Sequence, residues 1–296
     1  MNRSILTAAL LAACSGGAPA TDAPADPKAV EKAGEPVILQ DKGSDTMVNL
    51  MQRMSEEYTK VKPSVVVAVT GGGSGTGIKS LIDKTTDLAN SSRKMKPEEI
   101  EKAKSNGVDP VETVVAFDGL AIYVNKDNPL QQISFEELKC IFDATGTCNA
   151  WKDLGVTMDC GGEDKIIKVG RQNNSGTYEY FREEILGKEG KFTNTMDQSG
   201  TQQVVDVIGT SKCAIGYGGM GYHTETARFV CLSKAKGEPC KEPSVESVKA
   251  GEYAFGRPLQ VYTNGAPAGE IKAFIDWILA PEGQKVVLDA GYVPLK

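Results

Sequence analysis

The sequence has few of the residues that metal sites and common catalytic motifs use. Its 296 residues include one histidine, His223, and no CxxC pair, so the usual zinc sites have too few ligands. The glycine-rich stretch 71–77 does not match GxxxxGK[ST], GxGxxG or GxSxG, and His223 has no recognisable serine or cysteine partner. The sequence therefore indicates no metal, no cofactor and no enzyme of a familiar kind.

Long apolar runs and a basic surplus are also missing. After the first dozen residues, no apolar run approaches the roughly 20 residues that cross a bilayer. The net charge is -6, with acidic and basic residues mixed, whereas a nucleic-acid-binding surface would show basic patches or stripes. Nucleic acid is therefore not an expected partner, and a small anion would have to be attracted by local geometry.

The N-terminus has the pattern of an export signal. A short apolar run follows Arg3, and the stretch Leu11-Ala12-Ala13-Cys14 resembles the lipobox of bacterial lipoproteins. This predicts a signal peptide over residues 1–14 and a lipid on Cys14, which would anchor the protein to a membrane in the periplasm or at the cell surface. An ordinary signal peptide is the alternative. Residues 15–36 are rich in Ala, Pro and Gly and are expected to form a flexible tether.

If the protein is exported, its remaining cysteines are expected to form disulfides. Six are left after Cys14, an even number that suits up to three disulfides in an oxidising compartment. Six cysteines allow 15 pairings, and the short separations favour Cys140 with Cys148 and Cys231 with Cys240. The candidates are Cys140, Cys148, Cys160, Cys213, Cys231 and Cys240.

Strand-like and helix-like segments alternate along the chain. Residues 65–70 form a continuous apolar, β-branched run typical of a buried parallel strand, and apolar residues between 47 and 58 recur at helical spacing. Residues 111–117 and 120–124 read as two strands, and residues 268–279 and 281–290 as two helices. This alternation predicts an α/β protein with largely parallel sheets.

Three predicted strand-to-helix turns consist of small and hydroxyl-bearing residues: 43–46, 71–77 and 175–177. Such turns offer unpaired backbone N–H groups, the positive end of a helix dipole and a Ser or Thr hydroxyl. Arg171 precedes the third turn, and its planar guanidinium suits an oxyanion. A single turn of this kind is usually only a helix cap. The three together predict a cage of neutral donors around one buried cation.

The same stretches carry a family resemblance. The motifs GSDTM, GGGSGTGI, ANSSR, FDGLAIYVNKDNP, GRQNNSGTYEYF and the ending IKAFIDWILAPEGQKVVLDAGYVPL resemble the phosphate-binding component of bacterial phosphate ABC transporters. The similarity runs from Val37 to Lys296, and the combination of motifs is specific.

The resemblance implies a type II periplasmic binding protein, in which two α/β lobes joined by a two-strand hinge enclose one phosphate. Lobe 1 would comprise residues 37–118 and 260–296, and lobe 2 residues 119–259. Its partners would be phosphate and the permease subunits of the transporter, with the protein itself a monomer. The phosphate-binding residues carried over are Ser44, Thr46, Ser74, Gly75, Arg171, Ser175, Gly176 and Thr177.

Two positions depart from the family pattern. Well-known members have an aspartate, which accepts the proton of HPO4 and rejects sulfate, where this chain has Ser92 followed by Arg93. Asn173 also replaces an acidic residue that pairs with the binding arginine in some members. We therefore expect Asp118, or failing that Asp45, to supply the acceptor, and Arg93 to add a second cation. A role for Asp118 as a residue of the hinge turn is an equal alternative.

Two other functions stay open at this point. Without the aspartate, the chain could bind another tetrahedral oxyanion, such as sulfate, molybdate or tungstate. A phosphate-handling enzyme is the less favoured reading, because no nucleophile and base are recognisable together in the sequence.

Overall fold

The computed structural model describes residues 36–162, 164–187, 189–222 and 224–296. The predicted signal peptide, the lipidation site Cys14, nearly all of the tether and His223 lie outside these residues. In the described part of the chain, no helix is both long and apolar enough to cross a bilayer.

The first lobe is built on three parallel strands with β1 in the middle, paired with β2 on one side and β3 on the other. Leu88 belongs to a core with helices α1, α8 and α9, and Ala89 to a core with α2 and α3. Neighbouring strand residues face opposite ways, so helices cover both faces of this sheet. The elements are β1 (Val37–Gly43), α1 (Val48–Val61), β2 (Val65–Thr70), α2 (Ser74–Ile82), β3 (Leu88–Ser91), α3 (Pro97–Ser105), α8 (Gly269–Leu279) and α9 (Pro281–Asp289).

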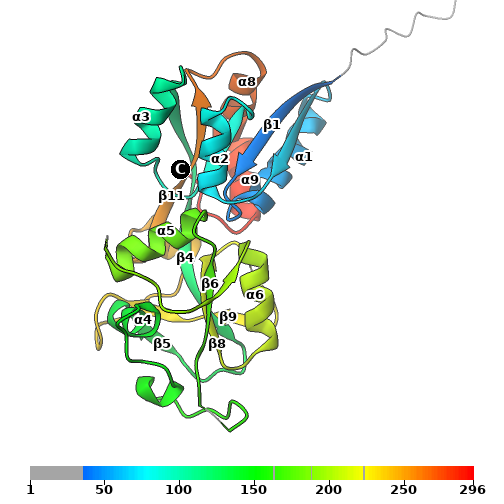
Figure 1. The fold of residues 1–296 in the computed structure, drawn as a ribbon. Coiled ribbons are helices and arrows are strands. Elements are labelled where there is room, and N and C mark those ends of the chain that lie inside the picture. The colour runs from blue at the N-terminus through cyan, green and yellow to red at the C-terminus, as the bar shows by residue number, and fades with distance from the viewer. Residues whose placement is uncertain (1–35, 163, 188, 223) are drawn as a thin grey trace, which may run out of the picture. The chain divides into compact units, whose positions relative to one another are not determined.

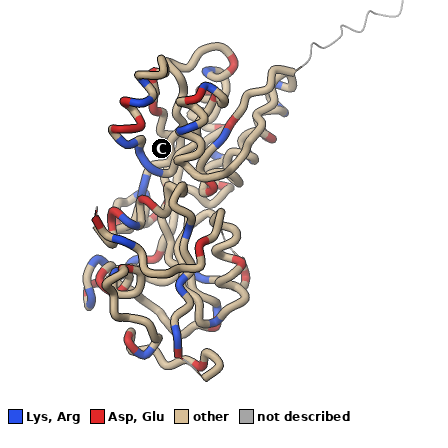
Figure 2. The backbone as a smooth tube through the Cα atoms, in the orientation of Figure 1, with Lys and Arg blue, Asp and Glu red and all other residues tan. Residues whose placement is uncertain are grey.

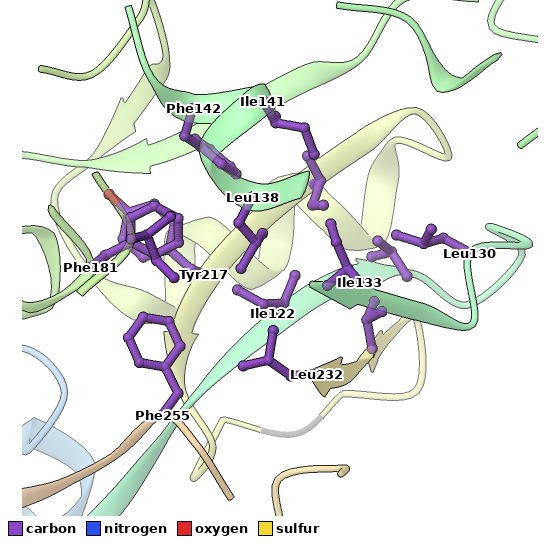
Figure 3. Packing of buried hydrophobic residues seen from close by; sticks show 14 of the residues in the cluster. Ile122, Leu130, Ile133, Leu138, Ile141, Phe142, Phe181, Tyr217, Leu232 and Phe255 are labelled. Atoms are coloured by element: carbon purple, nitrogen blue, oxygen red, sulfur yellow. The ribbon is translucent and has the colours of Figure 1, made fainter. Parts of the chain in front are cut away.

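The second lobe repeats this plan around the parallel strands β8, β6 and β7. Its largest core joins β4 to α4 and α5, and the rings of Phe181 and Tyr217 stack in it with centroids 4.1 Å apart (Figure 3). The elements are β5 (Gln132–Ser134), α4 (Phe135–Phe142), η1 (Trp151–Leu154), β6 (Ile167–Arg171), α5 (Gly176–Phe181), η2 (Arg182–Leu186), β7 (Met196–Gln198), α6 (Thr201–Thr210), β8 (Ala214–Gly219), β9 (Ala227–Phe229), β10 (Cys231–Ser233) and α7 (Val245–Lys249).

Two long strands, β4 (Pro110–Asn125) and β11 (Gly256–Asn264), run between the lobes (Figure 1). They pair with each other in antiparallel register, while β11 also pairs with β3 and β4 also pairs with β8. We call β4 and β11 the hinge strands. The break expected between residues 117 and 120 is absent because Asp118 and Gly119 stay in the ladder, opposite Arg257 and Gly256.

All six cysteines of the described chain are paired. Cys140 bonds to Cys148 and Cys231 to Cys240, as the short separations predicted, and the third bridge joins Cys160 to Cys213. The Cys140 to Cys148 and Cys231 to Cys240 bridges close loops of 8 and 9 residues, whereas the Cys160 to Cys213 bridge spans 53 residues. The three bridges therefore crosslink only the second lobe.

A buried carboxyl and a buried amide face each other beneath the first lobe's polar edge. Asn90 Nδ2 donates to Asp41 Oδ2 at 2.8 Å, while Asp41 Oδ1 and Asn90 Oδ1 have no partner in the described part of the chain. One proton on Asp41 Oδ1 would serve both oxygens, because the acid could then donate to the amide oxygen. Burial raises the pKa of Asp41 to about 7, which agrees with a neutral carboxyl.

We predict that this pair makes stability depend on pH. The folded pKa of Asp41 lies above its unfolded value, so the folded state binds more protons between the two and stability falls as pH rises. The free energy of unfolding should drop by about 3 kcal/mol between pH 5 and pH 8 through this group. Asp41→Asn places an amide opposite Asn90 and should remove that part of the drop in urea unfolding measured at both pH values.

The exposed carboxylate of Asp276 offers a control. Asp276→Asn should leave the pH dependence of the parent protein in place. If Asp41→Asn and the parent gave parallel curves of unfolding free energy against pH, Asp41 would not be the proton-binding group.

Candidate functional site

The polar site lies where loops at the carboxyl ends of parallel strands from the two lobes meet. The turn after β1 carries Ser44 and Thr46, α2 begins at Ser74 directly after the β2 turn, and Ser92 follows β3. From the second lobe, β6 ends at Arg171 and α5 begins after Ser175. Carboxyl ends of strands in open α/β sheets are where such folds bind ligands.

Hydroxyl groups from both lobes touch one another here. Thr46 Oγ1 lies 2.9 Å from Thr177 Oγ1 across the lobe boundary. Ser44 Oγ donates to Ser92 Oγ at 3.0 Å, and Ser74 Oγ lies 3.4 Å from Ser92 Oγ. All of these side chains are buried. We call this group the hydroxyl cluster: Ser44, Thr46, Ser74, Ser92 and Thr177.

Ser175 and Gly176 complete the turn that faces the cluster. Ser175 caps α5, because its Oγ accepts from the backbone N–H groups of Thr177 at 3.1 Å and Tyr178 at 3.4 Å. Since a hydroxyl that accepts in this way keeps its own hydrogen, Ser175 can still donate to a ligand. A Cβ on Gly176 would lie 2.3 Å from Ser74 Oγ, so only glycine lets the second lobe come this close to the first.

Arg171 is a buried cation with an unused donor. Its Nη2 forms an ion pair with Asp45 Oδ2 at 2.9 Å and also donates to Ser199 O, while its Nη1 donates to Thr201 Oγ1 at 3.1 Å. Among the residues that the structure describes, its Nε has no hydrogen-bond partner. Burial lowers the pKa of Arg171, and Asp45 opposes that shift. A guanidinium nevertheless stays protonated, so this buried donor is available to an anion.

Arg93 lies beside the cluster but is committed to another partner. Its Nη1 and Nη2 donate to Glu99 at 2.8 and 2.7 Å, and the side chain lines a neighbouring cavity of about 410 Å³. Gly75 is similarly occupied, because its N–H donates to Asn174 O in the other lobe at 3.0 Å. In this arrangement Glu99 engages both Nη groups of Arg93, and Asn174 engages the N–H of Gly75.

Asp118 is fully buried and pairs with an arginine that the sequence did not point to. Arg257 donates to Asp118 Oδ2 from Nε at 3.0 Å and from Nη2 at 2.8 Å, and the N–H of Met220 donates to Asp118 Oδ1 at 3.1 Å. Burial raises the pKa of Asp118, and the charge of Arg257 opposes that rise. Asp118 therefore lies beside the hydroxyl cluster as the counter-ion of Arg257, and its role as the proton acceptor stays a prediction.

Sequence reasoning missed Arg257, Thr201 and Asn174. The signal for Arg257 was weak: one cation ahead of Pro258 in an otherwise apolar, strand-like run. Thr201 and Asn174 look like ordinary helix-start and loop residues. Their importance comes from contacts to Arg171 and Gly75 that join segments far apart in the sequence.

The fold and these buried donors define a two-lobe α/β binding protein with a polar site between its lobes. A family model described as a PBP superfamily domain matches residues 25–282. The phosphate-binding protein PstS of Pseudomonas aeruginosa is 35% identical over 308 residues, which covers 100% of this chain and 95% of that relative. The PstS of Staphylococcus saprophyticus is 32% identical over 294 residues, covering 97% and 86%.

Solved structures agree with these relatives. A Clostridium perfringens protein, assigned as a phosphate ABC transporter substrate-binding protein and solved with bound phosphate, matches with a TM-score of 0.76 and 27% identity. The match covers 88% of this chain and 100% of that chain. The chain therefore belongs to the PBP superfamily and, within it, to the family of these phosphate-binding proteins.

The close approach at Gly176 generates a prediction about closure. Gly176→Ala should hold the lobes apart, because the added Cβ would overlap Ser74 Oγ and Ser92 Oγ, at 2.3 and 2.7 Å. X-ray scattering in phosphate buffer should give a larger radius of gyration than for the parent protein. Gly256→Ala is the control, since a Cβ there meets its nearest neighbour at an ordinary 3.5 Å. Equal radii for all three proteins would contradict the prediction.

Proposed function

We propose that this protein captures inorganic phosphate between its lobes and delivers it to the membrane permease of an ABC transporter. The observation that carries the proposal is a buried guanidinium, Arg171, whose Nε has no partner among the described residues and whose ion pair with Asp45 joins it to the turn that carries Ser44 and Thr46. The names of the relatives, phosphate-binding protein PstS, support phosphate as the ligand.

The proposed contacts fall into two groups. Arg171, Ser175, Gly176 and Thr177 come from the second lobe and supply one cation, hydroxyls and backbone N–H groups. The first lobe adds hydroxyls, with the N–H of Gly75 once Asn174 gives it up. The first-lobe contacts are Ser44, Thr46, Ser74, Gly75 and Ser92. Arg93 stays at the rim, where its ion pair with Glu99 holds it.

The mechanism is capture by closure about the hinge strands. Phosphate replaces the contacts that the hydroxyls now make with one another, so fixed donors of both lobes bridge the same ion. Exclusion of water strengthens these hydrogen bonds, because the effective dielectric constant inside the site is lower than in water. No covalent step is needed, and we propose no enzymatic activity.

Selectivity against sulfate needs an acceptor for the proton of HPO4. Asp118 Oδ1 accepts one backbone N–H and Asp45 Oδ1 accepts the N–H of Gly72, so each oxygen keeps a lone pair. We propose Asp118 as the acceptor and Asp45 as the alternative. Facing a bare sulfate oxygen, the same carboxylate would be repulsive.

Further proposals concern the protein's place in the cell. Residues 1–14 act as a lipoprotein signal peptide, Cys14 carries the lipid, and residues 15–36 tether a monomer at the outer face of a membrane. Residues 37–118 with 260–296 form lobe 1 and residues 119–259 form lobe 2.

Basic and acidic residues are mixed on both lobes (Figure 2). This distribution suits a small anion that binds through nearby hydrogen-bond donors.

Isothermal titration of the protein that starts after Cys14 tests the function. We expect one-to-one phosphate binding and no heat with sulfate at pH 5.5 or pH 8. Arg171→Gln should weaken phosphate binding by on the order of 100-fold, the usual worth of a hydrogen bond to a charged group. Comparable binding of sulfate, molybdate or tungstate would favour the other oxyanions, and turnover of a chromogenic phosphate ester would favour an enzyme.

A second prediction concerns Asp118. Asp118→Asn removes the negative charge, so sulfate should no longer be repelled and the ratio of phosphate to sulfate affinity should fall at least about 10-fold. Competition titrations of both anions at pH 8 measure the ratio. If it stayed unchanged, Asp118 would not be the acceptor, and Asp45→Asn would be the next variant to test.

A further inference from the structure

Arg257 reaches the hydroxyl cluster from a hinge strand, whereas the hydroxyls of the cluster come from turns and helix starts of the two lobes. It lies on the hinge strand β11 and its side chain is buried. Its Nη2 donates to Thr177 Oγ1 at 3.1 Å and to Thr46 Oγ1 at 3.3 Å, hydroxyls that belong to opposite lobes. One guanidinium therefore contacts both halves of the hydroxyl cluster.

The hinge ladder places this guanidinium. Arg257 lies opposite Asp118 in the pairing of β4 with β11. Asp118 Oδ2 accepts hydrogen bonds from both Nε and Nη2 of Arg257. The ring of Tyr180 packs against the guanidinium, 5.5 Å from the ring centroid. These contacts restrict the rotamers of the Arg257 side chain, so its guanidinium is already oriented before an anion binds.

The contacts also leave Arg257 with donors to spare. Its Nη1 carries two N–H groups but makes one contact among the described residues, a long one of 3.4 Å to Ser92 O. Nη2 shares its two N–H groups among Asp118 Oδ2, Thr177 Oγ1 and Thr46 Oγ1. One threonine hydroxyl donates to the other, which leaves one hydroxyl hydrogen of the pair for a ligand. Arg257 thus offers an N–H of Nη1 beside a hydroxyl that can still donate.

The charges of the site balance in pairs. Arg171 pairs with Asp45 and Arg257 with Asp118, so each buried cation has one carboxylate. Beyond its ion pair, Arg257 contacts one hydroxyl from each lobe, which are the groups that a ligand bridging the lobes would also reach. We propose that Arg257 is a second phosphate-binding arginine and that Asp118 positions it on the hinge strands. This inference rests on the proposed phosphate function.

Three variants separate an effect of Arg257 on phosphate affinity from its effect on the stability of the fold. Arg257→Gln leaves Asp118 buried without a partner, so it should lower both the melting temperature and phosphate affinity, the latter on the order of 100-fold. The double variant Asp118→Asn with Arg257→Gln removes both charges and should regain most of the melting temperature. We expect its phosphate affinity to stay on the order of 100-fold below the parent. Arg257→Lys keeps a cation beside Asp118 and should bind roughly 10-fold more weakly, because it lacks the planar fork.

Arg228→Gln is the matched control. Like Arg257, Arg228 has a guanidinium that is at least partly buried and that stabilises the fold through hydrogen bonds, here to Phe229 O, Asn128 O and Leu130 O. It should lower the melting temperature and leave phosphate affinity within about 3-fold of the parent, since its hydrogen bonds among the described residues go to residues outside the site. Circular dichroism melting and isothermal titration at pH 7.5 give the two readouts.

The outcomes are distinct. Parent-like phosphate affinity in the double variant or in Arg257→Lys would overturn the role of Arg257 and leave the proposed function in place. A parent protein that bound sulfate instead of phosphate would overturn the ligand, and the same panel titrated with sulfate would decide the role of Arg257. A parent that bound neither anion would overturn both proposals.

Discussion

Burying two guanidinium groups where the lobes meet is the constraint on which the rest of the structure depends. An isolated charge taken out of water costs several kcal/mol or more, so each arginine must be surrounded by partners. Arg171 has Asp45, Thr201 and the Ser199 carbonyl, and Arg257 has Asp118 with two threonine hydroxyls. Asp45 and Thr46 come from the first lobe and Thr177 and Thr201 from the second, so satisfying these charges requires residues of both lobes.

The backbone makes this arrangement possible through small residues at helix starts. Gly176 lets α5 approach the first-lobe serines, and serine and threonine satisfy helix N–H groups while keeping a hydrogen for a ligand. The hinge strands fix the position of a second pair of residues at the site. Because Asp118 and Arg257 are opposite residues in one ladder, the register of these strands fixes the geometry of their ion pair.

Much of this could be predicted from the sequence. The α/β alternation, the strand at 65–70, the three hydroxyl-rich turns and the two short disulfides all depend on local patterns that one chain segment carries by itself. One expectation was wrong because a long-range contact decides it: the strands predicted at 111–117 and 120–124 are one strand, since β11 pairs across the expected break. The ion pair of Arg93 with Glu99 also depends on the folded chain, and the role of Arg93 at the ligand stays a prediction.

The sequence by itself determined which residues could donate to an anion and which turns would present them, since helix capping and strand periodicity act over a few residues. Only the tertiary structure decided which of those donors converge and which are already occupied. Arg257 joins the site from a position 80 residues after Thr177 and 139 after Asp118, and no local pattern records such a contact. Its role arises from strand register and from the need to pair a buried charge, both of which exist only in the folded chain.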